Sequence, residues 1–295
     1  MSDPIIRPLA FENLDEALRL STVVGWNQRL DDWHMLLRLA PAGAFAALLD
    51  ARIVGTAIGI DYGGFAWIAM MLVDPACRGR GVGRCLLEAA IDAVPSNVPI
   101  RLDATPLGRP LYRRYGFEDE AALSRHVIDA PLKPPACARN GSGRATARRA
   151  PPIVRPLTNA DLDKVIEQDR ETFGGTRGAV LDWAFHGAAQ YAYVVQSDNG
   201  LIHYCLGRRG RVFDQIGPVV AGDDDMAHAL VSAALAAAGD RRVAVDAFDP
   251  STLRPFESLR VAPSIVEGRQ AQGRPEQGRG ATRHGASFGA GRGQF

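Results

Sequence analysis

A short loop between an expected strand and an expected helix carries residues with a recognisable chemistry. The loop is Arg78-Gly79-Arg80-Gly81-Val82-Gly83, and it follows an apolar segment that ends at Val73-Asp74-Pro75. The first amides of a helix have no partner within it, and glycine lets an anion approach the backbone closely. Arg78 and Arg80 add guanidinium groups, which bind phosphate oxygens. The loop therefore predicts a binding site for a pyrophosphate.

The glycine spacing separates this loop from two common nucleotide-binding motifs. In the dinucleotide motif G-x-G-x-x-G, the third glycine would fall at Arg84 or Leu86. The P-loop needs Gly-Lys before Ser or Thr, which the chain lacks. Arg78-x-x-Gly81-x-Gly83 instead resembles the acetyl-CoA loop of GNAT-family N-acetyltransferases. A glycine loop that caps the helix without binding a ligand is the alternative.

The resemblance extends to a segment around Tyr112. The sequence Leu111-Tyr112-Arg113-Arg114-Tyr115-Gly116-Phe117 is similar to the family's F-Y-x-x-x-G-F segment. In the family, the first tyrosine lies near the cofactor sulfur and can protonate the departing thiolate, and Tyr112 has that place here. A phenol in a dry site can act as such an acid. The alternative is an amphipathic aromatic packed on a core helix, which is the interpretation we adopt for Tyr115.

Two positions depart from the family's pattern. Ala104 stands where many members have an asparagine that binds the cofactor, eight residues before this tyrosine. Residues 65–73 contain no carboxylate, although many members have a glutamate there as general base. Asp61 and Asp103, at strand ends, are the nearest acidic residues. A water chain to Asp61, or an amine that arrives already neutral, would take the place of the glutamate.

A second candidate site is Gly25-Trp26-Asn27-Gln28, followed by Asp32-Trp33. It lies between two expected helices, and it resembles a GNAT subgroup that has a second GNAT-like half. In this fold the segment lines the acceptor side, so Trp26 would form an aromatic wall, and Asn27 and Gln28 would supply amide groups. The alternative is a helix connection capped by Asn27. We expect Trp33 in the core, because Asp32-Trp33 recurs as Asp182-Trp183.

The surrounding pattern indicates a mixed sheet with helices. We expect strands at 4–9, 44–49, 53–60, 65–73 and 100–103, and helices at 14–24, at 30–39 and from Val82 onward. The three strands between 44 and 73 are joined by short turns, and should be antiparallel. The fold class is α/β, an α+β mixed sheet with the GNAT acyl-CoA N-acyltransferase fold that the resemblance implies.

The pattern occurs twice in the chain. Ile6-Arg7-Pro8-Leu9 precedes Leu14-Asp15, and Val154-Arg155-Pro156-Leu157 precedes Leu162-Asp163 at the same spacing. A duplicated domain is the simplest explanation. In the second copy, Asp223-Asp224-Asp225 begins the helix, and these carboxylates would repel a pyrophosphate. We therefore expect a degenerate second half, which has lost CoA binding and either shapes the acceptor site or forms the contact of a homodimer.

Composition divides the chain into four parts. We expect a GNAT domain at 1–130, a linker at 131–151, a degenerate domain at 152–259 and a disordered tail at 260–295. The linker is rich in Pro, Arg, Ala and Gly and lacks apolar periodicity. The tail has too few aliphatic residues to offset the entropy of ordering. Its abrupt start also suggests a shift of reading frame, which would leave the second domain incomplete.

Charge and cysteine content exclude several classes of protein. Lys+Arg 34 against Asp+Glu 33 gives a net charge of +1, which argues against a protein that coats nucleic acid or an acidic membrane. The four cysteines lack the spacing of a zinc site or a disulfide scaffold, so we expect no metal. The N-terminus lacks the features of a signal peptide. A cytoplasmic enzyme is therefore expected.

Together these features indicate transfer of an acetyl group from acetyl-CoA directly to a primary amine of a small molecule or peptide. The proposed cofactor-binding residues are Leu72, Val73, Arg78, Gly79, Arg80, Gly81, Val82 and Gly83. The backbones of Leu72 and Val73 would pair with the pantetheine arm, and an N–H near Met71 or Leu72 would polarise the thioester carbonyl. A CoA-binding regulatory module without turnover is the alternative, favoured by the missing glutamate and asparagine. A scaffold without CoA affinity is the third class.

Overall fold

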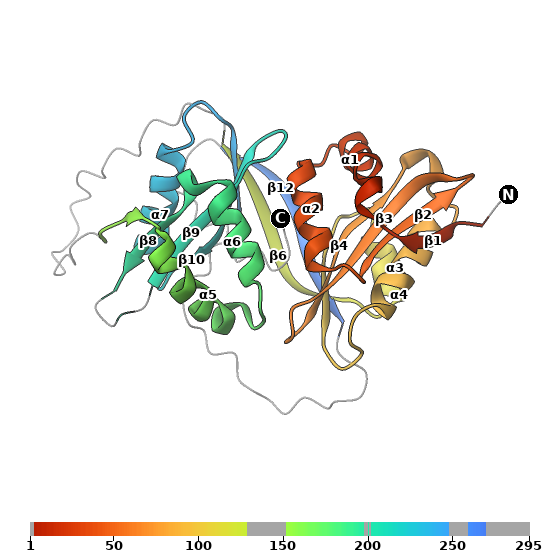
Figure 1. Ribbon diagram of the computed structural model, residues 1–295, viewed down its shortest axis with the longest axis horizontal. Helices are drawn as coiled ribbons and strands as arrows, with labels where there is room; N and C mark the ends of the chain where they lie inside the picture. The colour runs from red at the N-terminus through yellow and green to blue at the C-terminus, as the bar shows by residue number, and fades with distance from the viewer. Residues whose placement is uncertain (1–2, 129–151, 198–199, 201, 248–258, 270–295) are drawn as a thin grey trace.

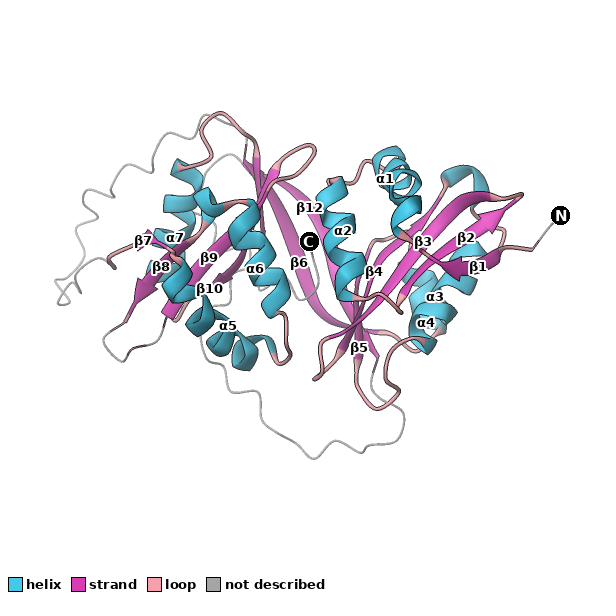
Figure 2. Cartoon of the chain, in the orientation of Figure 1, coloured by secondary structure: helices cyan, strands magenta, loops and turns pink. Residues whose placement is uncertain are grey.

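A computed structural model of the chain describes residues 3–128, 152–197, 200, 202–247 and 259–269. Within these residues the strands form a single twelve-stranded sheet with helices on both faces (Figures 1 and 2). The strand order is β1-β2-β3-β4-β5-β12-β6-β11-β10-β9-β8-β7. We call residues up to 128 the first half and residues from 152 the second half. The sheet runs from one half into the other through β12 and β6.

The first half follows the predicted order of elements. They are β1 (Ile5–Pro8), η1 (Phe11–Asn13), α1 (Leu14–Val23), α2 (Leu30–Leu39), β2 (Ala44–Leu49), β3 (Arg52–Asp61), β4 (Ala66–Val73), η2 (Pro75–Cys77), α3 (Val82–Asp92), β5 (Ile100–Ala104), α4 (Arg109–Arg114) and β6 (Glu118–Ile128). As predicted, β2, β3 and β4 are antiparallel. Helices α1 and α2 cover one face of the sheet, and α3 and α4 cover the other. Trp33 is fully buried, as expected.

The second half repeats this arrangement. Its elements are β7 (Arg155–Pro156), α5 (Asn159–Phe173), α6 (Gly178–Gly187), η3 (Ala189–Tyr191), β8 (Tyr193–Gln196), β9 (Ile202–Arg208), β10 (Asp214–Val220), α7 (Asp224–Ala236), β11 (Val243–Ala247) and β12 (Leu259–Arg269). Strand β10 is antiparallel to β9 and parallel to β11, as β4 is to β3 and β5. No helix in the described ranges is both long and apolar enough to cross a membrane.

The two halves exchange their last strands. Strand β6 pairs with β11 of the second half, and β12 pairs with β5 of the first half. The two exchanged strands also pair with each other, from Leu259 opposite Ile128 to Gly268 opposite Glu118. Figure 1 shows both strands at the centre of the molecule, between the two groups of helices. The sheet of each half is therefore completed by a strand from the other.

Strand β12 corrects the expectation of a disordered tail from residue 260. Residues 259–269 form a strand that is hydrogen-bonded on both sides, and 270–295 lie outside the described residues. Backbone pairing with two neighbours orders this segment, and composition does not report such long-range pairing. The second half therefore has the final strand that sequence analysis did not find. The expected linker at 131–151 also lies outside the described residues.

Helix α3 packs closely against β3 at two glycines. A Cβ atom on Gly55 would lie 2.8 Å from Leu86 Cδ1 and 3.1 Å from Val82 Cγ1. A Cβ atom on Gly59 would lie 2.6 Å from the carbonyl oxygen of Ala90. The two glycines are four residues apart, so they lie on the same face of the strand. Their missing side chains allow the helix to rest directly on the sheet, which fixes where α3 begins.

Replacement of Gly59 by alanine tests this packing. The new methyl group would meet the backbone of α3, so we expect Gly59→Ala to lower the free energy of unfolding by about 1–3 kcal/mol. Urea denaturation of the full chain measures the change. Gly187→Ala is the matched control, because a Cβ atom on Gly187 would meet nothing within 4 Å. Equal stability of the two variants would contradict the close packing.

Candidate active site

The loop between β4 and α3 has an accessible, amide-rich backbone. Gly79 and Gly81 have φ angles of +76° and +79°, and the space where their Cβ atoms would lie is open. The first helical bond of α3 runs from the Cys85 N–H to the Gly81 carbonyl at 3.1 Å, and the first turn contains no acidic residue. The N–H groups that precede Cys85 therefore have no intrahelical acceptor. This backbone fits a pyrophosphate.

Asp74 anchors the start of this loop. Its carboxylate accepts a hydrogen bond from the Ala76 N–H at 3.1 Å, which caps η2. The same carboxylate forms ion pairs with Arg19 at 3.6 Å and Arg52 at 3.5 Å. Its own N–H donates to the Val54 carbonyl at 2.8 Å. The chain therefore leaves β4 at a well-defined point, eight residues before α3 begins.

Strands β4 and β5 separate toward the C-terminal end of β4, which leads into the loop. Their parallel pairing covers only Ala66–Ile68 opposite Ile100–Leu102. Strand β4 then continues to Val73, beside β3 but with no recorded pairing to β5. Leu72 and Val73 therefore have a strand edge that faces away from β3. An extended ligand can hydrogen-bond to such an edge as an added strand.

A bulge in β4 lies at the start of this edge. The register with β3 shifts between Thr56 and Ile58, and Met70 has a φ angle of +52°. The buried Thr56 hydroxyl donates to the Met70 carbonyl at 2.9 Å. Because a trans peptide directs its N–H opposite to its C=O, the Met71 N–H points away from the Thr56 hydroxyl. The bulge therefore offers a candidate hydrogen-bond donor beside the part of β4 that does not pair with β5.

Tyr112 lies on α4, next to the first turn of α3. A Cβ atom on Gly83 would lie 3.5 Å from Leu111 Cδ2 and 3.6 Å from Val73 Cγ2, so α4, the loop and β4 meet there. The Tyr112 side chain is buried, and its hydroxyl lies 3.1 Å from the position that a Cβ atom on Gly108 would take. The structure therefore packs α4, the helix that carries Tyr112, against the start of α3 through Leu111.

In the Trp26–Gln28 segment, which was predicted to line the acceptor site, the Asn27 side chain contacts the second half. The Asn27 amide donates to the Phe213 carbonyl at 2.8 Å and accepts from the N–H groups of Val212 and Phe213. The Trp26 carbonyl accepts from Arg211 at 2.9 Å. Gln28 is buried beside them in the chain. The segment binds the β9–β10 loop of the second half, so Asn27 is committed to holding the halves together.

Asp61 lies far from the bulge. It ends β3 at the β3–β4 turn, and its carboxylate accepts from the Gly63 N–H at 2.7 Å. It is five residues beyond Thr56, which corresponds to about 17 Å along a strand. The structure therefore does not bring Asp61 to the part of β4 where the thioester would lie.

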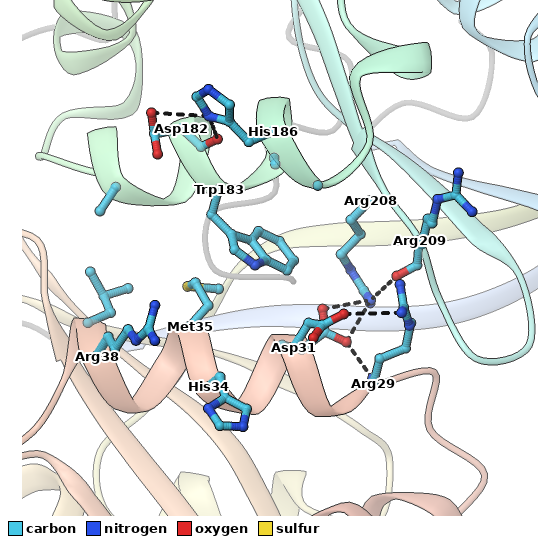
Figure 3. Close-up of a pocket in the computed structure, with 15 residues that line it drawn as sticks. Arg29, Asp31, His34, Met35, Arg38, Asp182, Trp183, His186, Arg208 and Arg209 are labelled. Atoms are coloured by element: carbon cyan, nitrogen blue, oxygen red, sulfur yellow. Dashed lines mark hydrogen bonds and ion pairs between the residues drawn. The ribbon is translucent and has the colours of Figure 1, made fainter. Parts of the chain in front are cut away.

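A cavity of about 730 Å³ lies between α2 and α6, and thus between the two halves. Its walls include Met35 and Leu39 from α2, Trp183 and His186 from α6, and Arg208 and Arg209 at the end of β9. In Figure 3, Trp183 extends from α6 toward α2, and Arg208 reaches toward the start of α2. Sequence analysis did not anticipate this site, because its residues are distant in the chain.

A buried polar network supports one end of the cavity. Arg208 is paired with Asp32 at 3.2 Å and donates to Gln215 at 3.1 Å. Gln215 donates to Asp246 at 2.9 Å, and Asp246 accepts two hydrogen bonds from Arg125 at 2.8 Å. Burial raises the pKa of Asp32, although Arg208 acts in the opposite direction. The network joins α2 and β6 of the first half to β9, β10 and β11 of the second.

Two parts of the chain match models of one protein family. Residues 41–119 match one model of the acetyltransferase (GNAT) domain, and residues 165–254 match another. The chain belongs to the GNAT family. It is therefore an acyltransferase, and its family uses acetyl-CoA as co-substrate and acts on amines.

Two relatives match over much of their length. An uncharacterized N-acetyltransferase, YitH, of Bacillus subtilis is 24% identical over 222 residues, which are 75% of this chain and 74% of the relative. Holothin acyltransferase of a Pseudoalteromonas species is 25% identical over 221 residues, which are 72% of this chain and 67% of the relative.

Solved structures share the fold of the whole chain. A putative acetyltransferase from Pyrococcus horikoshii has a TM-score of 0.71 and 21% identity, with 92% of this chain and 91% of that chain covered. A tandem GNAT protein from the clavulanic acid biosynthesis pathway has a TM-score of 0.62 and 15% identity, with 92% and 100% covered. The GNAT fold is therefore present in duplicate.

The second GNAT half lacks the features of the first cofactor loop. Only residues 221–223 separate β10 from α7. Asp223 caps α7 by accepting the Met226 N–H at 2.8 Å, and Asp224 and Asp225 occupy its first turn. A Cβ atom on Gly222 would lie 3.0 Å from the His203 ring. Among the described residues, no group of three or more metal-binding side chains is present in either half.

Replacement of Asn27 distinguishes its two roles. In Asn27→Ala, the N–H groups of Val212 and Phe213 lose their acceptor, so we expect the free energy of unfolding to fall by about 1–3 kcal/mol. Thermal unfolding measures this loss, and steady-state kinetics measure the KM for an amine. An unchanged unfolding temperature together with a raised KM would show that Asn27 belongs to the acceptor site instead.

Proposed function

We propose that the chain transfers an acetyl group from acetyl-CoA directly to a primary amine of a small molecule or peptide. The proposal rests on the first half, where the bulge of β4, its edge at Leu72 and Val73 and the glycine loop lie in succession; among the described residues, no strand pairs with that edge. That succession matches the parts of one ligand, with a thioester, an extended arm and a pyrophosphate. The second half, with three aspartates at the start of α7, takes no part in cofactor binding.

The loop and strand bind different parts of the cofactor. The backbones of Leu72 and Val73 pair with the pantetheine arm. The pyrophosphate accepts hydrogen bonds from the backbone amides between Gly79 and Gly83, and Arg78 and Arg80 add charge-assisted bonds. Because Val82 is buried against β3, this part of α3 keeps its position when the ligand binds. Such a preorganised site lowers the entropic cost of binding.

The Met71 N–H and Tyr112 act on the two sides of the thioester. The Met71 N–H donates to the carbonyl oxygen and stabilises the negative charge that develops as the amine nitrogen attacks. As the new C–N bond forms and the C–S bond breaks, the Tyr112 hydroxyl gives its proton to the sulfur. The amine reacts in its neutral form and releases its second proton to solvent, because Asp61 is too distant to accept it. The Tyr112 phenolate takes up a proton from solvent, which restores the acid for the next turnover.

Removal of the Tyr112 hydroxyl tests this role. We expect Tyr112→Phe to lower kcat by about 10²-fold, as removal of a general acid typically does, with little change in the Kd for CoA. Release of the CoA thiol reports turnover, and calorimetry reports binding. Tyr115→Phe is the matched control, because the Tyr115 hydroxyl donates instead to Glu88 at 2.6 Å. Equal kcat values in both variants would show that Tyr112 is not the general acid.

A further inference from the structure

We propose that the cavity between α2 and α6 binds the acceptor amine and selects acceptors that also carry a carboxylate. This inference rests on the proposed function, since it identifies the second substrate of the same reaction. It also assigns a task to the second half, which supplies one wall of the cavity and its most deeply buried arginine.

The cavity has the size and walls of a small-molecule site. Its volume of about 730 Å³ lies within the range of roughly 300–1,000 Å³ that is usual for such sites. Trp183 from one half faces Met35 and Leu39 from the other, which gives apolar walls for a ring or an aliphatic chain. Because both halves contribute, the site exists only in the complete chain.

Arg208 supplies a buried donor at one end. Its side chain is 6% exposed, and its terminal nitrogens bind Asp32, Gln215 and the Arg209 carbonyl. Its Nε atom is buried and has no hydrogen-bond partner among the described residues. A buried N–H without an acceptor costs free energy. A ligand oxygen in the cavity would satisfy it.

The rim of the cavity has an excess of positive charge. The lining includes four arginines and three aspartates. Arg29 is paired with Asp31 at 3.1 Å, and Arg208 with Asp32 at 3.2 Å. Arg38 and Arg209 also line the cavity, and neither forms an ion pair within the described part of the chain. Arg209 directly follows Arg208. In Figure 3 the Arg209 side chain points away from that of Arg208, so a carboxylate at this end would meet Arg208, and Arg209 adds a nearby positive charge.

Helix α2 lies between the cavity and the face of the sheet that it covers. Met35 lines the cavity and also belongs to the buried cluster that contains Met70 and Leu72. The cofactor loop leads into α3, which covers the opposite face of the sheet. The acceptor and the cofactor can thus approach the separated strands β4 and β5 from different faces without competing for space.

Two pairs of amines that differ only in charge test the inference on the full chain. One pair is 4-(aminomethyl)benzoate and 4-(aminomethyl)benzamide, and the other is glycylphenylalanine and its C-terminal amide. We expect at least one acid to be acetylated with a kcat/KM about 10-fold or more above that of its amide. The same acid should raise the unfolding temperature without acetyl-CoA.

Arg209→Glu should reduce both effects, because it reverses a charge near the carboxylate end. Arg7→Glu is the matched control, since Arg7 is exposed on the edge strand β1. Arg208 is left unchanged because its removal would leave Asp32 buried and uncompensated. A reduced preference in Arg209→Glu but not in Arg7→Glu supports the site.

The possible failures are distinguishable. If the amides are acetylated as efficiently as the acids, or the preference is unchanged in Arg209→Glu, the inference is wrong and the proposed function stands. Binding of an acid without acetylation would make the cavity an effector site and overturn its role as acceptor site. If no acid binds, the inference fails, and protection by acetyl-CoA then decides separately whether the proposed function fails with it.

Discussion

The contact between β3 and α3 is the constraint on which the cofactor site depends. Gly55 and Gly59 let the helix rest on the strand, and this sets the position of the amides at the start of α3. Between those glycines, the Thr56 hydroxyl donates to the Met70 carbonyl at the bulge of β4. One strand thus positions both the glycine loop and the bulge that we propose to act at the thioester carbonyl.

The exchange of β6 and β12 turns two similar halves into one molecule. Each half is completed by a strand of the other, and the polar network from Asp32 to Arg125 crosses between them. Asn27 adds a third connection at the β9–β10 loop. The second half, which has aspartates at the start of α7, completes the sheet of the first half and forms one wall of the cavity.

Local features were predictable from the sequence, and long-range pairings were not. The glycine loop, the element order and buried Trp33 follow from spacing and periodicity within short segments. The contacts of Asn27 lie 186 residues away in the chain, so its amide looked equally suited to a substrate. Strand β12 was missed because its order comes from its two neighbours. Asp61 was a candidate base only because nothing in the sequence shows how far along β3 the bulge lies.

Calorimetric titration of the full chain with CoA tests the central claim most directly, namely that only the first half holds the cofactor. We predict one CoA-binding site per chain. In Gly81→Asp, a carboxylate next to the pyrophosphate should abolish the binding heat, whereas Gly81→Asn, of similar shape and equally tolerant of positive φ, should retain most of the affinity. Two CoA-binding sites per chain, or CoA binding that survives Gly81→Asp, would contradict a single cofactor site in the first half.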